Sequence, residues 1–154
     1  MKTKELVVLL KERGQTLSTA ESCTGGGVGH AITAISGSSA VYAGGIISYT
    51  NDVKEKVLSV PREILEQYGA VSPQTAKAMA EGVKALLQTD YGISVTGLAG
   101  PDGDGSGKPV GLVYIGVSGA NVTEVREYIF QGNREEIRNQ AVDETINLIM
   151  LFAQ

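Results

Sequence analysis

The chain has 154 residues, of which 42% are hydrophobic and 19% are charged; this is typical of a globular protein, and we expect one domain over residues 1–154. Its net charge of −4 argues against nucleic acid as the main partner, because a phosphate backbone is bound by clustered Lys and Arg. The single cysteine, Cys23, allows no internal disulfide, and no apolar run is long enough to span a membrane, so we expect a cytoplasmic protein.

The first half of the chain alternates predicted helices and strands. Leucines at helical spacing predict a helix over 3–13, and a short strand over 16–22 follows it. A helix that begins at Thr24 as its cap comes next, then a buried strand over 41–50 and a short helix that Asn51 caps. This alternation is typical of the α/β class.

The second half predicts three more helices and three more strands. In chain order these are a helix over 61–69, a helix over 72–90 capped by Ser72, a strand over 91–98, strands over 110–119 and 123–132, and a C-terminal helix. The last two strands are joined by a short turn and should pair antiparallel. We therefore expect a three-layer α/β/α fold with a mostly parallel sheet and an antiparallel pair late in the chain.

Three segments with polar residues and glycines follow predicted strands. They are 22–26, 49–54 and 98–109. In open α/β sheets, ligands bind outside the carboxyl ends of the strands. We therefore expect these three segments to meet at one edge of the sheet.

The segment SCTGG, residues 22–26, carries backbone N–H groups into a predicted helix start, which is either an anion site or a plain capped helix. It lacks the lysine of a Walker-type phosphate loop. The segment GLAGPDGDGSGKPVG, residues 97–111, is a long loop that we expect to form a ligand-facing wall. Its two aspartates do not match the calcium-binding EF-hand spacing, so the sequence predicts no metal site.

Two single residues, Cys23 and His30, are further candidates for catalytic groups. Cys23, at a helix start, is either a nucleophile with a favoured thiolate or a small buried filler. His30, the only histidine, falls inside a predicted helix, where pairing with a serine is awkward. We expect a surface or core histidine.

The stretch GSSAVYAGGIISYTNDVKEKVL, residues 37–58, contains serines, Tyr49 and Lys54. Serine and lysine can perform acyl transfer together if the lysine is neutral. That requires lowering its pKa by about three units from about 10.4, of which a helix N-terminus supplies little and burial must supply the rest. Tyr49 would then relay a proton. Alternatively, the serines form a turn and Lys54 is solvated, and the spacing leaves both interpretations open.

Several segments occur together in an order that indicates one family. They are TAESCTGG (19–26), GSS (37–39), YTNDVK (49–54), GAVS (69–72), GLAGPDG (97–103) and KPVGLVYIG (108–116). With these segments the chain closely resembles the CinA C-terminal domain family, whose stand-alone members are PncC-type nicotinamide mononucleotide amidohydrolases. The resemblance runs from about residue 5 to the end.

The resemblance implies hydrolysis of nicotinamide mononucleotide to nicotinate mononucleotide and ammonia, in pyridine nucleotide recycling, by a homodimer without metal or cofactor. By position it implies Ser39 as nucleophile, Lys54 as general base and Tyr49 as proton relay. Ser22 is the alternative nucleophile. Substrate-binding residues implied by the same matches are Ser22, Cys23, Thr24, Gly25, Gly26, Gly97, Ala99, Gly100 and Arg134. A catalytically silent module that binds a phosphorylated nucleotide is the alternative function.

Overall fold

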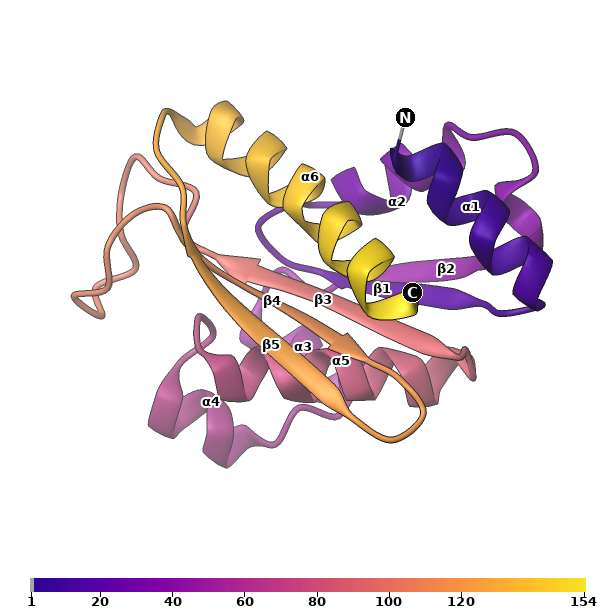
Figure 1. Cartoon of the computed structure of the whole chain (residues 1–154). Coiled ribbons are helices and arrows are strands. Elements are labelled where there is room, and N and C mark those ends of the chain that lie inside the picture. The colour runs from indigo at the N-terminus through magenta and orange to yellow at the C-terminus, as the bar shows by residue number, and fades with distance from the viewer. Residues whose placement is uncertain (1) are drawn as a thin grey trace.

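A five-stranded mixed sheet lies between two layers of helices in the computed structural model, which describes residues 2–154 (Figure 1). In chain order the elements are α1 (Lys2–Arg13), β1 (Leu17–Glu21), α2 (Gly27–Thr33), the 3-10 turn η1 (Ser38–Ala40), β2 (Tyr42–Ile47), α3 (Asn51–Leu58), α4 (Arg62–Tyr68), α5 (Pro73–Leu87), β3 (Tyr91–Gly97), β4 (Leu112–Ser118), β5 (Thr123–Ile129) and α6 (Arg134–Ala153).

The strand order is β2-β1-β3-β4-β5. The first three neighbours run parallel, with Glu21 at the end of β1 paired with Ile47 of β2 and Val95 of β3. The strands β4 and β5 form the antiparallel pair that the short turn predicted, and β4 also pairs antiparallel with β3. The predicted α/β layered fold is therefore confirmed, and the carboxyl ends of β1, β2 and β3 lie at one edge.

Each face of the sheet has its own helix layer and its own apolar core. The helices α1, α2 and α6 cover one face and α3, α4 and α5 the other (Figure 1). Leu10 and Ile149 belong to the first core, whereas Met79 and Val83 belong to the second. Because both faces are covered, β3 is buried along its interior positions, as its continuous apolar sequence predicted. Within residues 2–154, no helix is both long and apolar enough to cross a bilayer.

The start of α3 fixes the position of Lys54. Thr50 caps this helix by accepting a hydrogen bond from the Val53 N–H at 3.3 Å, so the predicted cap Asn51 is instead the first helical residue. Lys54 is consequently the fourth helical residue, and its N–H donates to the Thr50 carbonyl as the first regular helical bond. The helix start brings Lys54 back toward the sheet edge that β2 has just left.

Candidate active site

Lys54 is a buried lysine whose amine has three oxygen atoms as hydrogen-bond partners. Its side chain is 1% exposed, and Nζ donates to the Ser48 carbonyl at 2.7 Å, the Ser22 hydroxyl at 3.1 Å and the Tyr49 carbonyl at 3.3 Å. Among residues 2–154 no carboxylate pairs with it. An ammonium in this place has lost its water without gaining a counter-charge, which is costly.

Burial lowers the pKa of Lys54 to about 8, because desolvation disfavours the charged amine. At pH 7.5 to 8 an amine with that pKa is neutral in a large fraction of molecules. A neutral amine 3.1 Å from a serine hydroxyl can accept its proton. The geometry and the lowered pKa together make Lys54 competent as a general base.

We expect the rate of the reaction proposed below to depend on the protonation of this amine. The sign is fixed, since only the neutral form accepts a proton: kcat/KM should rise with pH and level off above an apparent pKa near 8. Initial rates measured from pH 6 to 10 at constant ionic strength give the profile. A rate that is flat from pH 6, or that falls between pH 6 and 8, contradicts the assignment of Lys54 as the base.

Ser22, and not Ser39, is the serine beside Lys54. Ser22 follows β1 directly, its N–H donates to the Val95 carbonyl at 2.9 Å, and its side chain is buried. Ser39 is exposed in η1, which precedes β2, whereas Lys54 follows β2. The length of β2 therefore separates the two residues, and the predicted pairing of Ser39 with Lys54 is wrong.

A pocket of about 270 Å³ opens over this serine–lysine pair. It brings together many of the predicted site residues: Ser22, Cys23, Tyr49, Lys54, Gly97, Ala99, Gly100 and Arg134. Leu98, Asp102 and Asp104 also line the pocket and belong to the loop 97–111 that was expected to form a wall, whereas Ala70, Val71 and Thr96 were not expected there. Nothing in the sequence of the segment GAVS indicates how close residues 70 and 71 come to the end of β3.

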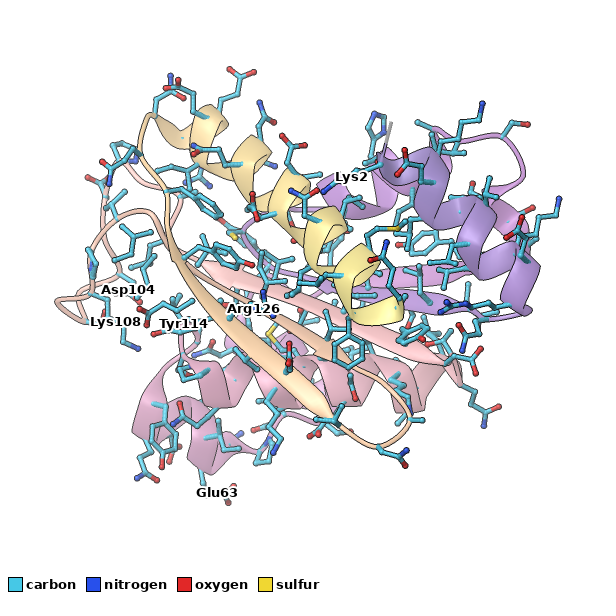
Figure 2. The ribbon with its side chains drawn as sticks, in the orientation of Figure 1. Lys2, Glu63, Asp104, Lys108, Tyr114 and Arg126 are labelled. Carbon is cyan, nitrogen blue, oxygen red and sulfur yellow. The ribbon has the colours of Figure 1, made fainter. Side chains whose placement is uncertain are left out.

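The loop between β3 and β4 extends beyond the sheet edge and forms one wall of the pocket (Figure 1). Figure 2 shows Asp104 and Lys108 on this loop. Lys108 Nζ donates to the Tyr68 carbonyl at 2.8 Å and the Val71 carbonyl at 2.5 Å. The lysine thus ties the loop to the end of α4 and to the segment carrying Val71, so that two walls of the pocket are held together.

Arg134, the first residue of α6, reaches the pocket from the other helix layer. Its Nη1 donates to the Gly100 carbonyl at 2.7 Å and its Nη2 to the Tyr49 hydroxyl at 3.3 Å. The Tyr49 hydroxyl thus lies at the guanidinium group. The structure does not support the predicted relay between Lys54 and a serine, because Lys54 contacts only the backbone carbonyl of Tyr49.

The segment 22–26 divides between the pocket and the interior. Thr24, Gly25 and Gly26 do not line the pocket. The helix α2 starts at Gly27, and its cap is Gly26 instead of the predicted Thr24. The N–H groups of Val28 and Gly29 donate to the Glu21 carboxylate at 2.9 and 3.0 Å. A carboxylate of the chain itself therefore occupies this helix start, which favours the plain helix start over the anion site.

Cys23 is a buried thiol. It is 6% exposed, and burial raises its pKa to about 12, so the thiol stays protonated despite the nearby helix start. This favours the filler interpretation over the nucleophile. His30 is exposed on α2. Within residues 2–154, no three His, Cys, Asp or Glu side chains gather into a set that would hold a metal ion.

A family model described as the CinA C-terminal domain matches residues 1–152. The chain belongs to the CinA C-terminal domain family. A CinA-like protein of Acaryochloris marina is 57% identical over 128 residues, 82% of this chain and 30% of that protein. A CinA-like protein of Synechococcus sp. (strain RCC307) is 50% identical over 144 residues, 92% of this chain and 34% of that protein. The chain spans about a third of the length of these curated relatives.

Solved CinA structures share the whole fold. A CinA superfamily protein from Klebsiella pneumoniae superposes with a TM-score of 0.96 at 32% identity, covering 99% of this chain and 95% of that one. The competence/damage inducible protein CihA from Agrobacterium tumefaciens gives a TM-score of 0.92 at 38% identity, covering 100% and 97%. The family resemblance seen in the sequence is thus confirmed over nearly the full chain.

Proposed function

We propose that this CinA-family chain is an amidohydrolase that converts nicotinamide mononucleotide to nicotinate mononucleotide and ammonia in pyridine nucleotide recycling. The observation that carries the proposal is the Ser22 hydroxyl 3.1 Å from the buried amine of Lys54, at the floor of a pocket that also contains an arginine. A neutral lysine beside a serine is an acyl-transfer pair, and a carboxamide carbon is a suitable electrophile.

In the proposed reaction Lys54 takes the proton of Ser22 while Oγ attacks the carboxamide carbon. The tetrahedral intermediate collapses when the Lys54 ammonium gives its proton to the departing nitrogen, which leaves as ammonia. Water then attacks the Ser22 ester, again with Lys54 as base, and releases the carboxylate and the free serine. Each proton taken up by the amine is returned, so the enzyme is regenerated.

Backbone amides of the pocket are suited to the negative charge that develops on the carboxamide oxygen. The N–H groups of Cys23, Ala99 and Gly100 donate to no backbone carbonyl within residues 2–154, and all three residues line the pocket. Fixed N–H donors near a reacting carbonyl stabilise the oxyanion of the tetrahedral intermediate. We assign the oxyanion to this group of amides.

Arg134 is our candidate for the substrate phosphate. Two of its nitrogens are held by Gly100 and Tyr49, which orients the guanidinium group toward the pocket while leaving donors for an anion. Arg134→Gln should raise KM by about 10- to 100-fold, the cost of about 1.5–3 kcal/mol for a hydrogen bond to a charged group. Steady-state kinetics measure it, with Arg126→Gln on the exposed part of β5 as the control.

An unchanged KM in Arg134→Gln would mean that Arg134 does not bind the substrate phosphate. The rise in KM caused by Arg134→Gln should also be smaller for nicotinamide riboside, which lacks the phosphate. Equal losses on both compounds would mean that Arg134 organises the pocket through Gly100 and Tyr49 rather than binding the phosphate.

Incubation of the pure protein with nicotinamide mononucleotide, followed by assays of ammonia and nicotinate mononucleotide, tests the function. We expect equal amounts of both products. Nucleotide binding in calorimetry without ammonia release would instead establish the alternative, a silent binding module. The homodimer stays a prediction.

A further inference from the structure

The Glu21 side chain is a buried carboxylate that the proposed reaction does not use. It is 2% exposed and accepts hydrogen bonds from the Thr24 hydroxyl at 2.7 Å, the Val28 N–H at 2.9 Å and the Gly29 N–H at 3.0 Å. Within residues 2–154 it has no Lys or Arg partner. The carboxylate is therefore held by neutral donors and the first turn of α2, where free N–H groups favour a negative charge.

The backbone of Glu21 is connected by hydrogen bonds to Lys54. Its carbonyl accepts from the Ser48 N–H at 2.8 Å, and the Ser48 carbonyl accepts from Lys54 Nζ at 2.7 Å. Ser22 is the next residue along the chain. Glu21 is thus linked to the Lys54 amine through the backbone of Ser48, and it is the chain neighbour of the residue that carries the Ser22 hydroxyl.

A second side chain also holds this loop. Arg138 of α6 donates from Nε to the Cys23 carbonyl at 2.9 Å and from Nη2 to the Thr24 carbonyl at 3.2 Å. Glu21 satisfies N–H and hydroxyl donors and Arg138 satisfies carbonyl acceptors. The loop that begins at Ser22 is consequently fixed through both kinds of polar group.

We propose that Glu21 is a positioning residue that sets the distance between the Ser22 hydroxyl and the Lys54 amine. This inference rests on the proposed function. The carboxylate contacts neither atom: it fixes the turn from β1 into α2, and the direction of the Ser22 side chain follows from that turn. It also occupies the amino end of α2 in place of an anion from the substrate, so substrate binding does not depend on it.

Glu21→Gln tests the inference with little change in size. The amide presents an NH2 group where the carboxylate had an acceptor, so one donor of Thr24, Val28 or Gly29 faces another donor and the turn must shift. Because a displacement of about 1 Å can cost about 100-fold in rate, we expect kcat to fall about 30- to 100-fold. KM and the calorimetric affinity for nicotinate mononucleotide should stay within about twofold. The control is Glu63→Gln, exposed on α4 (Figure 2), with unchanged kinetics.

A second variant covers the case in which Glu21→Gln does not fold. Thr24→Val removes one donor to the carboxylate at almost constant volume and outside the pocket. It should lower kcat about 3- to 10-fold at constant KM, an effect on the scale of one hydrogen bond. Circular dichroism and thermal unfolding establish that the assayed variants are folded.

The two proposals fail in different ways. If the wild-type chain releases no ammonia, the proposed function is wrong. If it does, and a folded Glu21→Gln or Thr24→Val has wild-type kcat, the positioning role is wrong. A rise in KM or a loss of product affinity with unchanged kcat would also overturn it, since Glu21 would then act on substrate binding.

Discussion

Replacing Ser22 by alanine should remove turnover of nicotinamide mononucleotide almost completely. The substitution deletes the only hydroxyl within hydrogen-bond distance of Lys54 Nζ among residues 2–154. Loss of a nucleophile in a concerted catalytic group lowers kcat by about 10³-fold or more. Ammonia release by the purified variant at pH 8 gives the value, and rapid quenching with mass spectrometry of the wild-type protein should locate the acyl ester on the peptide that contains Ser22.

Ser39→Ala is the matched control for this experiment. Ser39 is exposed at the other end of β2, so its replacement should leave kcat and KM within about twofold, the range of a surface substitution. The assignment fails if Ser22→Ala keeps its activity, if Ser39→Ala loses it, or if the ester forms on a different residue.

Replacing Lys54 by methionine should abolish activity without weakening the fold at neutral pH. Methionine has a similar volume and no charge, so the base is lost while the packing stays. Below pH 8 the wild-type protein buries a protonated amine whose pKa has been lowered from 10.5 to about 8. Removing that buried charge offsets the loss of its hydrogen bonds. Ammonia assays and urea denaturation at pH 7 should find an inactive variant at least as stable as the wild type.

The pH dependence of stability provides the control. Between pH 8 and 10.5 the unfolded chain keeps a proton on Lys54 that the folded chain has lost. The free energy of unfolding of the wild type should therefore increase with pH relative to that of Lys54→Met. Comparing the two proteins cancels the titration of all other groups. A variant that stays active, or one whose stability difference from the wild type is the same at pH 7 and pH 10, contradicts the account of Lys54.

The order of helices and strands and the edge where the site lies were predictable from the sequence. Buried strands, caps such as Ser72 and the glycines that follow β1 and β3 are local signals, and the carboxyl ends of parallel strands lie at one edge whatever the details. Lys54 was also predictable as a candidate base, with burial as the main cause of its lowered pKa.

Which serine pairs with Lys54 was not predictable from spacing, because the distance between two residues along the chain does not show whether they lie at the same end of a strand. Ser39 is nearer to Lys54 along the chain, but the parallel pairing of β1 with β2 brings Ser22 to the same edge. Glu21 was missed for a similar reason: an acidic residue just before a glycine-rich helix start is a signal for an internal anion, but only the turn shows that its carboxylate bends back to Val28 and Gly29.

A direct titration of the Lys54 amine tests the central claim, that burial lowers the pKa of this amine to about 8. The protein is labelled with ¹³C at the lysine Cε, the Lys54 resonance is identified by its absence in Lys54→Met, and its chemical shift is followed from pH 6 to 12. We expect an inflection near pH 8. An inflection near about 10.4, the value of a lysine in water, would contradict it.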